Sequence, residues 1–213
     1  MITDYDDIKK AVIRSQHCQR NFDLSKQVPQ QDLDLIVHAA TNCPSKQNIS
    51  FYNLHVITDQ ELIAKVHELT TGVTAKNLST SETDAPTTNS QTLANVLFVF
   101  ERKELSEMTP FASEKWAIAD ESETQIFERD LNVAIGIAAG YTNVVSSMLG
   151  YSTGCCQCFQ TNNIQELLGL KNRPVLLMGI GYKDPTRNRR EHATDSNLMF
   201  PTRKKEDITI TYK

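Results

Sequence analysis

The stretch SETQIFERDLNVAIGIAAGYTNVVSSML, residues 122–149, decides the fold. Its apolar residues recur at the spacing of an α-helix, which predicts one long helix. One face of this helix carries Phe127, Leu131, Ala134, Ile135, Ala138, Val145 and Met148, and a second face carries Val133, Ile137, Gly140 and Val144. A helix that is apolar on two faces is buried on two sides. The sequence therefore predicts that this helix is the centre of the domain or of a dimer interface.

Shorter elements flank the long helix on both sides. Apolar residues at helical spacing predict helices over residues 5–14, 29–41, 60–69 and 163–168. Apolar runs and alternating patterns predict strands over residues 51–57, 93–100, 150–158, 174–182 and 208–212. Residues 70–92 are dominated by Thr, Ser and Asn, and we expect a long surface loop there. The pattern favours one α+β domain over residues 1–213, with a central sheet and helices packed on it.

Composition and charge exclude several classes of protein. The 213 residues are 39% hydrophobic and 23% charged, which is typical of a folded globular chain. The formal net charge of −4 argues against sequence-independent binding of nucleic acid, which needs a surplus of cations. Asn132, Thr142 and Asn143 interrupt the most apolar stretch, so we expect no membrane span. With no apolar leader after Met1 and an odd count of five cysteines, we expect a cytoplasmic protein with reduced thiols.

Three polar turns carry the candidate ligand-binding residues. They are residues 16–23 (QHCQRNFD), 43–48 (CPSKQN) and 201–205 (PTRKK). Arg20 and Arg203 are the best candidates for a phosphate clamp, because guanidinium groups match phosphate oxygens in pairs. The alternative is that each is an ordinary solvated arginine. No G-x-G-x-x-G sequence and no P-loop is present, so neither a dinucleotide-binding Rossmann site nor an NTPase is supported.

A cluster of thiols at Cys155-Cys156-Gln157-Cys158 has the Cys-x-x-Cys spacing of zinc and redox sites. A structural zinc ion needs four ligands, and no second pair at suitable spacing is present. A thioredoxin-like pair begins a helix, whereas this pair ends a predicted strand. We therefore interpret the cluster as buried, unreactive thiols.

Taken in order along the chain, these segments resemble the FMN-dependent nitroreductase family. That family has a turn after its first helix that binds the flavin phosphate. The residues that occupy this turn here are Gln16, His17, Cys18, Arg20 and Phe22. The sequence departs from the family pattern in having Gln16 in place of an arginine, Cys18 in place of a serine and, further along the chain, Cys158 where glycine is common.

The resemblance extends to the later segments. Pro44, Ser45, Lys46 and Asn48 match a Pro-Ser-Ser-x-Asn turn that the partner subunit lends to the site, with Lys46 in place of the second serine. Asn89 resembles an asparagine that lies near the flavin ring. Gln157 and Cys158 resemble a loop whose backbone N–H groups face flavin N5. Arg203, near the end of the chain, is the last match.

The resemblance implies a homodimer with FMN at the subunit interface. It implies a mostly antiparallel central sheet flanked by helices, a long central helix at the dimer interface, and a C-terminal strand that extends to the partner. It also implies hydride transfer from NADH or NADPH to FMN, followed by reduction of a nitroaromatic or quinone-type acceptor. No side chain is expected to be an obligatory acid or base.

Two alternatives stay open. The first is a specialised relative, such as a dehalogenating or flavin-fragmenting enzyme, with residues 70–92 and 103–122 as a substrate lid. The second is a ligand-binding or thiol-regulatory protein that has kept the fold and uses the Cys155–Cys158 cluster.

Overall fold

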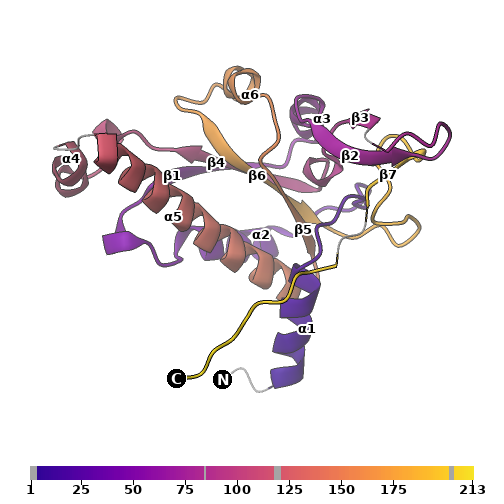
Figure 1. Ribbon diagram of the computed structural model, residues 1–213, viewed down its shortest axis with the longest axis horizontal. Helices are drawn as coiled ribbons and strands as arrows, with labels where there is room; N and C mark the ends of the chain where they lie inside the picture. The colour runs from indigo at the N-terminus through magenta and orange to yellow at the C-terminus, as the bar shows by residue number, and fades with distance from the viewer. Residues whose placement is uncertain (1–3, 84, 118–120, 202–203) are drawn as a thin grey trace.

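The computed structural model describes residues 4–83, 85–117, 121–201 and 204–213. Its helices are α1 (Tyr5–Ser15), α2 (Gln30–Thr41), α3 (Gln60–Glu68), α4 (Pro110–Ala117), α5 (Glu121–Met148) and α6 (Thr161–Leu168), with 3-10 turns η1 (Lys46–Asn48), η2 (Ser90–Thr92) and η3 (Leu105–Glu107). Its strands are β1 (Tyr52–Ile57), β2 (Gly72–Asn77), β3 (Ala85–Thr87), β4 (Val96–Arg102), β5 (Ser152–Cys156), β6 (Pro174–Gly181) and β7 (Leu198–Met199). The expected α+β class is confirmed (Figure 1).

The main sheet has four antiparallel strands in the order β1-β4-β6-β5. The central strand β4 is buried along almost its whole length, and its side chains alternate between two cores. Phe98 and Phe100 pack with α2 and α5, whereas Leu97 and Val99 pack with α3 and α6. A strand covered by helices on both faces has no need for polar residues, which explains the unbroken apolar run at 96–100.

Helix α5 is buried along one face only. Figure 1 shows it lying across the front of the main sheet, with its outer side uncovered along most of its length. The inner face agrees with the sequence prediction, because Leu131 and Ala138 are fully buried. On the outer face, Val133 is 55% exposed and Tyr141 is 46% exposed in the single chain. Met148 was expected on the inner face but is exposed, because 17 residues of helix turn it by about 100° away from Leu131.

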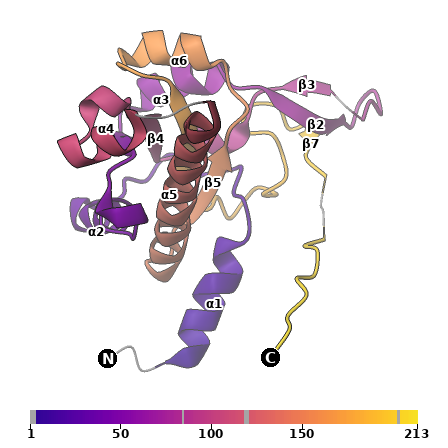
Figure 2. The ribbon, with the colours of Figure 1, turned by 60° about the vertical axis from the view of Figure 1, so that its left-hand side comes forward.

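The segment 70–92, expected to be a loop, instead forms most of a second sheet. Its strands pair in the order β3-β2-β7, and Figure 2 shows β2 and β3 projecting from the main body. A small core holds this sheet together, made of Ala75, Ala85, Leu198 and Phe200. Threonine favours extended backbone, so a Thr-rich segment forms strands once β7 supplies a partner. The loop prediction was wrong because that partner lies more than a hundred residues further along the chain.

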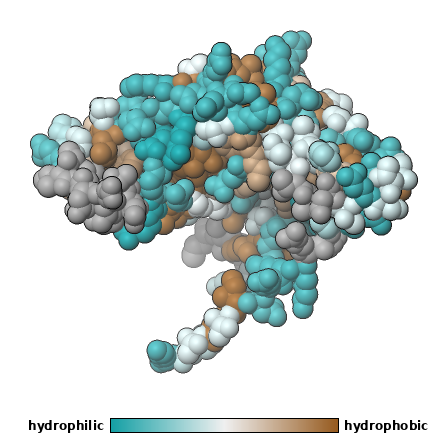
Figure 3. Space-filling view, turned by 45° about the horizontal axis from the view of Figure 1, so that its top comes forward, coloured by the Kyte–Doolittle hydropathy of each residue, from teal (hydrophilic) through white to brown (hydrophobic). Residues whose placement is uncertain are grey.

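The C-terminal strand expected at residues 208–212 is not formed in the single chain. Ile208 and Tyr212 are 76% and 91% exposed. Figure 3 shows this end of the chain standing apart from the body, with apolar and polar residues in alternation. A strand needs neighbouring backbone groups to accept and donate its hydrogen bonds, and no described segment supplies them here. Pairing with a partner subunit stays a prediction.

None of the helices in the described part of the chain has both the length and the apolar character needed to cross a membrane.

Candidate active site

The segment that follows α1 lies directly against strand β5. The Gln19 N–H donates to the Thr153 carbonyl oxygen of β5 (2.8 Å). Further along the segment, the Asp23 N–H donates to the carbonyl oxygen of Tyr182, just after β6 (2.8 Å). Gly154 makes this close approach possible. A Cβ atom at Gly154 would lie 2.7 Å from the Gln19 carbonyl oxygen and 2.5 Å from Gln91 Cβ.

An open hollow of about 180 Å³ lies where this segment, α5 and β5 meet. It is lined by Ser15, Gln16, Cys18, Asn143, Thr153, Gly154 and Cys155. Gln16 and Cys18, both expected to bind a ligand, therefore share one surface depression, whereas His17 is exposed and does not line it. Its lining offers polar groups from three separate segments of the chain, which is a common feature of small-molecule sites.

Arg20 lies at the side of this segment in an unusual environment. Its guanidinium carbon is 4.6 Å from the centroid of the Phe200 ring, and its Nε is buried without a hydrogen-bond partner. Burial lowers the pKa of Arg20, and the positive charges of Arg189 and Arg190 lower it further. The group nevertheless stays charged at neutral pH, because arginine titrates so high. Arg203, the second expected phosphate ligand, lies outside the described residues.

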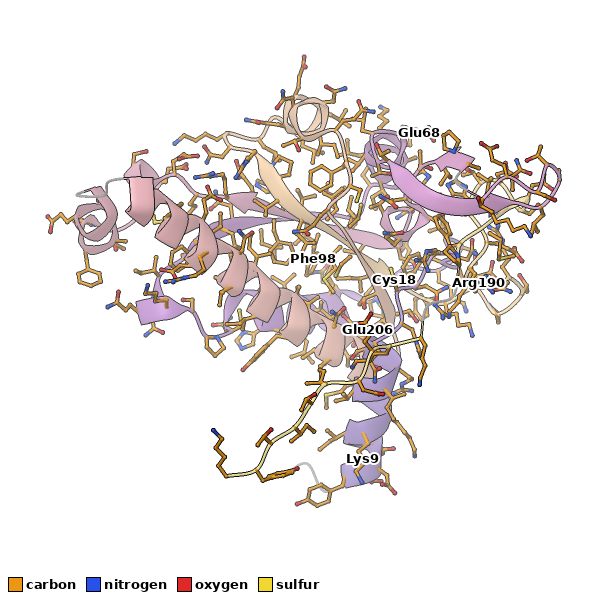
Figure 4. The ribbon with its side chains drawn as sticks, viewed as in Figure 1. Lys9, Cys18, Glu68, Phe98, Arg190 and Glu206 are labelled. Atoms are coloured by element: carbon orange, nitrogen blue, oxygen red, sulfur yellow. The ribbon has the colours of Figure 1, made fainter. Side chains whose placement is uncertain are left out.

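The turn that holds Pro44, Ser45, Lys46 and Asn48 lies far from this hollow in the single chain. It belongs to η1, near the opposite end of α5 from Cys18 (Figures 1 and 4). Lys46 Nζ lies 2.5 Å from an oxygen of Asp130 on α5. Asn48 lines a separate hollow of about 300 Å³ beside Phe111 of α4. One chain therefore does not bring its two expected site turns together.

Asn89 is buried and holds the end of β5 in place. Its amide nitrogen lies 2.9 Å from the Thr71 carbonyl oxygen and 3.0 Å from both the Cys158 carbonyl oxygen and Cys156 Sγ. The side chains of Gln157 and Cys158 are exposed just beyond these contacts. Asn89 thus fixes the backbone of the loop that carries two expected site residues.

Behind Asn89, two buried histidines and one threonine form a hydrogen-bonded chain. The Asn89 carbonyl oxygen can only accept, so His67 Nδ1 donates to it (3.1 Å) and His67 Nε2 accepts from Thr88 Oγ1 (2.8 Å). Thr88 Oγ1 in turn accepts from His192 Nε2 (2.9 Å), while the Thr194 N–H donates to His192 Nδ1 (3.3 Å). The chain joins α3, η2 and the loop before β7. Sequence reasoning missed it, since no local pattern links His67 to His192.

The prediction of a buried thiol cluster is correct for Cys156 but wrong for Cys155 and Cys158, which are exposed at the end of β5. The described thiols near the hollow are still poor nucleophiles, because desolvation by the surrounding protein raises the pKa of Cys155 to about 12 and that of Cys156 to about 11. Burial also raises the pKa of Cys18. Reactive thiols are those with a lowered pKa, so these groups are protonated at neutral pH. The described residues contain no group of three His, Cys, Asp or Glu side chains placed to hold a metal ion.

Comparisons with known proteins agree with this fold. The family model described as the nitroreductase family matches residues 13–182. No curated protein sequence matches the chain. Among solved structures, a nitroreductase family protein from Streptococcus pneumoniae is 17% identical with a TM-score of 0.61, covering 83% of this chain and 91% of that one.

Two further solved structures are similar over nearly their whole length. A protein from Exiguobacterium sibiricum, described as a nitroreductase in complex with FMN, is 17% identical with a TM-score of 0.59, covering 97% of this chain and 95% of that one. One from Staphylococcus epidermidis, described as an NAD(P)H:FMN oxidoreductase, is 19% identical with a TM-score of 0.60, covering 92% of each chain. At such identities the structures establish the shared fold. Together with the family match over most of its length, they show that the chain belongs to the nitroreductase family.

Proposed function

We propose that this protein is a homodimeric FMN-dependent oxidoreductase that uses NADH or NADPH to reduce nitroaromatic or quinone-type acceptors. The observation that carries the proposal is the hollow over Gly154, with Arg20 beside the segment that lines it. Arg20 Nε is a buried donor without a partner in the described structure, and a phosphate oxygen would satisfy it. Membership of the nitroreductase family supports the same cofactor.

The residues of this chain suit a flavin with a terminal phosphate. Gly154 lets the segment that carries Gln16 and Cys18 pack directly against β5, which gives the hollow its shape. Gln16, which lines the hollow, and the backbone of the loop at Gln157 and Cys158 would supply hydrogen-bonding groups to the flavin ring. Arg20, together with Arg203, would hold the phosphate. When bound, FMN accepts a hydride from reduced nicotinamide and passes two electrons to a second substrate.

The second expected turn would come from another copy of the chain. Because Lys46 and Asn48 lie near the opposite end of α5 from Cys18, a two-fold axis across α5 would carry one subunit's turn toward its partner's hollow. A lysine or amide donor at that position would stabilise negative charge on the reduced ring. Asn89 would act indirectly, by holding the Cys158 backbone in place.

The test is to purify the protein and reconstitute it with FMN. We expect the visible absorbance of a bound flavin and oxidation of NADH or NADPH that depends on an added nitroaromatic or quinone. A protein that binds neither FMN nor riboflavin, or that binds FMN without any turnover, would contradict the proposal.

A further inference from the structure

We infer that Arg20, Arg189 and Arg190 form a binding site for a phosphate monoester, at the side of the hollow lined by Gln16 and Cys18. Two of these arginines come from the loop between β6 and β7. The inference rests on the proposed function and deepens it, because it says which residues compensate for Gln16 and which group of a cofactor or substrate they recognise.

The loop between β6 and β7 is fixed against the segment that carries Arg20. Asn21 Nδ2 donates to the carbonyl oxygens of Asn188 (2.7 Å) and Glu191 (2.9 Å), which lie on either side of the two arginines. Asn21 is itself only 1% exposed. The two arginines are therefore held in place by a buried clamp rather than carried on a free loop.

Shared contacts bring the three guanidinium groups together. Arg189 Nη1 donates to the carbonyl oxygen of Cys18 (3.4 Å), two residues before Arg20. Arg190 Nε donates to the carbonyl oxygen of Phe200 (2.7 Å), and the ring of Phe200 lies beneath the Arg20 guanidinium. Figure 4 shows the labelled residues Cys18 and Arg190 in the same region of the molecule.

These three positive charges have no carboxylate partner among the described residues. The nearest acid along the loop, Glu191, pairs with Arg187 (3.4 Å). Arg187 also donates to the carbonyl oxygens of Ala193 (2.7 Å) and His192 (2.8 Å), so its role is structural. Among the described residues, the guanidinium groups of Arg189 and Arg190 each donate one hydrogen bond, which leaves most of their five N–H groups for a ligand.

Like charges repel each other, so such a cluster is costly unless an anion joins it. A guanidinium group matches the oxygens of a phosphate in pairs, and a phosphate monoester carries close to two negative charges at neutral pH. Arg20 Nε, buried and without a partner, is a second and independent sign of a missing acceptor. The chemistry of these donors therefore points to a phosphate dianion.

Two molecules relevant to the proposed activity carry this group. One is FMN, through its terminal phosphate, and the other is NADPH, through the phosphate on its adenosine ribose. Riboflavin and NADH are the matching molecules without the phosphate, so each pair isolates the contribution of that group.

The experiment compares the wild type with the double variant Arg189→Ala/Arg190→Ala. Dissociation constants are measured for FMN and riboflavin, and KM values for NADPH and NADH. We expect either the dissociation constant of FMN or the KM for NADPH to rise by about 10- to 150-fold, as for the loss of a charge-assisted hydrogen bond. The value for the matching molecule without the phosphate, riboflavin or NADH, should change by less than about twofold. Which pair responds identifies the source of the phosphate.

Arg173→Ala is the matched control, because Arg173 is an exposed arginine that pairs with Glu128 far from the hollow. Arg189→Gln/Arg190→Gln keeps polar side chains in place if the alanine variant fails to fold. Unchanged FMN affinity and unchanged KM for NADPH in a folded variant would overturn the inference and leave the proposed function intact.

A readout without flavin separates the two proposals. Inorganic phosphate at millimolar concentration should raise the Tm of the wild type but not that of the double variant. If the wild type binds no flavin, the proposed function fails, whereas this phosphate effect still supports the site. The absence of any difference between wild type and variant in phosphate overturns the inference.

Discussion

Gly154 controls how closely the segment after α1 approaches strand β5. Replacing it with alanine would place a Cβ 2.5 Å from Gln91 Cβ and 2.7 Å from the Gln19 carbonyl oxygen, so one of the two must move. We expect Gly154→Ala to lower the free energy of unfolding by about 1–3 kcal/mol, as for an overpacked site. Ser152→Ala in the same strand is the control and should cost less than about 1 kcal/mol. Chemical denaturation measures both, and equal stability of Gly154→Ala and wild type would contradict the described approach.

The histidine chain makes a second prediction, on pH. Burial lowers the pKa of His67, with a further contribution from His192, and burial also lowers the pKa of His192, although Asp195 and Glu68 act in the opposite direction. In the unfolded chain both histidines titrate near pH 6.5, roughly the ordinary value. Below that pH the unfolded state binds more protons than the folded state, so the free energy of unfolding falls as the pH falls.

The predicted slope is at most about 1.4 kcal/mol per pH unit for each histidine. Denaturation series between about pH 8 and 5 measure it. The His67→Gln variant should be less stable than the wild type at pH 8, but its free energy of unfolding should fall less on acidification. The control is His38→Gln, at an exposed position on α2, whose free energy of unfolding should depend on pH as that of the wild type does. If His67→Gln and His38→Gln show the same pH dependence, the histidine chain is not what makes the fold sensitive to acid.

Residues of the candidate site differ in how well the sequence could predict them. Gln16, Cys18 and Arg20 lie within five residues of each other, so their proximity follows from the chain itself. The contact of Asn89 with Cys158 and that of Arg189 with Cys18 span 69 and 171 residues. No local pattern encodes such pairs, because they result from the packing of complete elements. The sequence offers Arg189 and Arg190 as possible substitutes for the arginine missing at Gln16, but only the structure shows that Arg189 contacts Cys18.

Among the elements, the small sheet β3-β2-β7 has the weakest core, with four buried apolar side chains among its described residues. We expect Leu198→Ala to destabilise this sheet by about 2 kcal/mol, toward the lower end for a buried leucine because the site is near the surface. Hydrogen exchange should quicken in β2 and β3 while β4 and β6 keep their protection. Leu78→Ala, at a residue 51% exposed in the turn after β2, is the control. Uniform loss of protection over both sheets would show instead that they unfold as one unit.

The difference between the apolar main body and the polar small sheet also explains which elements could be predicted from the sequence. Helix α4 was not predicted, because its sequence PFASEKWA has little apolar periodicity. The other strands and helices of the main body carry apolar residues at a regular period, and their predicted bounds lie within a few residues of the observed ones. Strands β2 and β3 are rich in polar residues such as Thr, Lys and Asn, so no alternation of apolar residues predicted strands there. Their formation depends on β7, a two-residue strand that is itself too short to predict. Long-range pairing decided these elements, and local pattern decided the others.

At the scale of the whole molecule, three features of the single chain remain to be explained. The outer face of α5 is apolar and uncovered, the alternating C-terminal segment has no strand beside it, and the two expected site turns lie near opposite ends of α5. A second copy related by a two-fold axis along this face would account for all three. A stable interface of this kind buries upward of about 2,000 Å².

We therefore predict that Val133→Asp abolishes dimerisation while the chain stays folded. Val133 is already 55% exposed in the single chain, so a carboxylate is tolerated there, but two-fold symmetry would bury two such charges in the interface. At about 3–5 kcal/mol for each of the two buried, unpaired charges, the dissociation constant of the dimer should rise more than about ten-thousandfold. Sedimentation should change from a dimer to a 24.0 kDa species with an unaltered circular dichroism spectrum. Leu167→Asp, on α6 at the other face of the main sheet, should remain dimeric.

The affinity of Val133→Asp for FMN should fall when the dimer is lost, because the partner's 44–48 turn is then missing from each site. A monomer that retains full affinity for FMN would place the whole site within one chain.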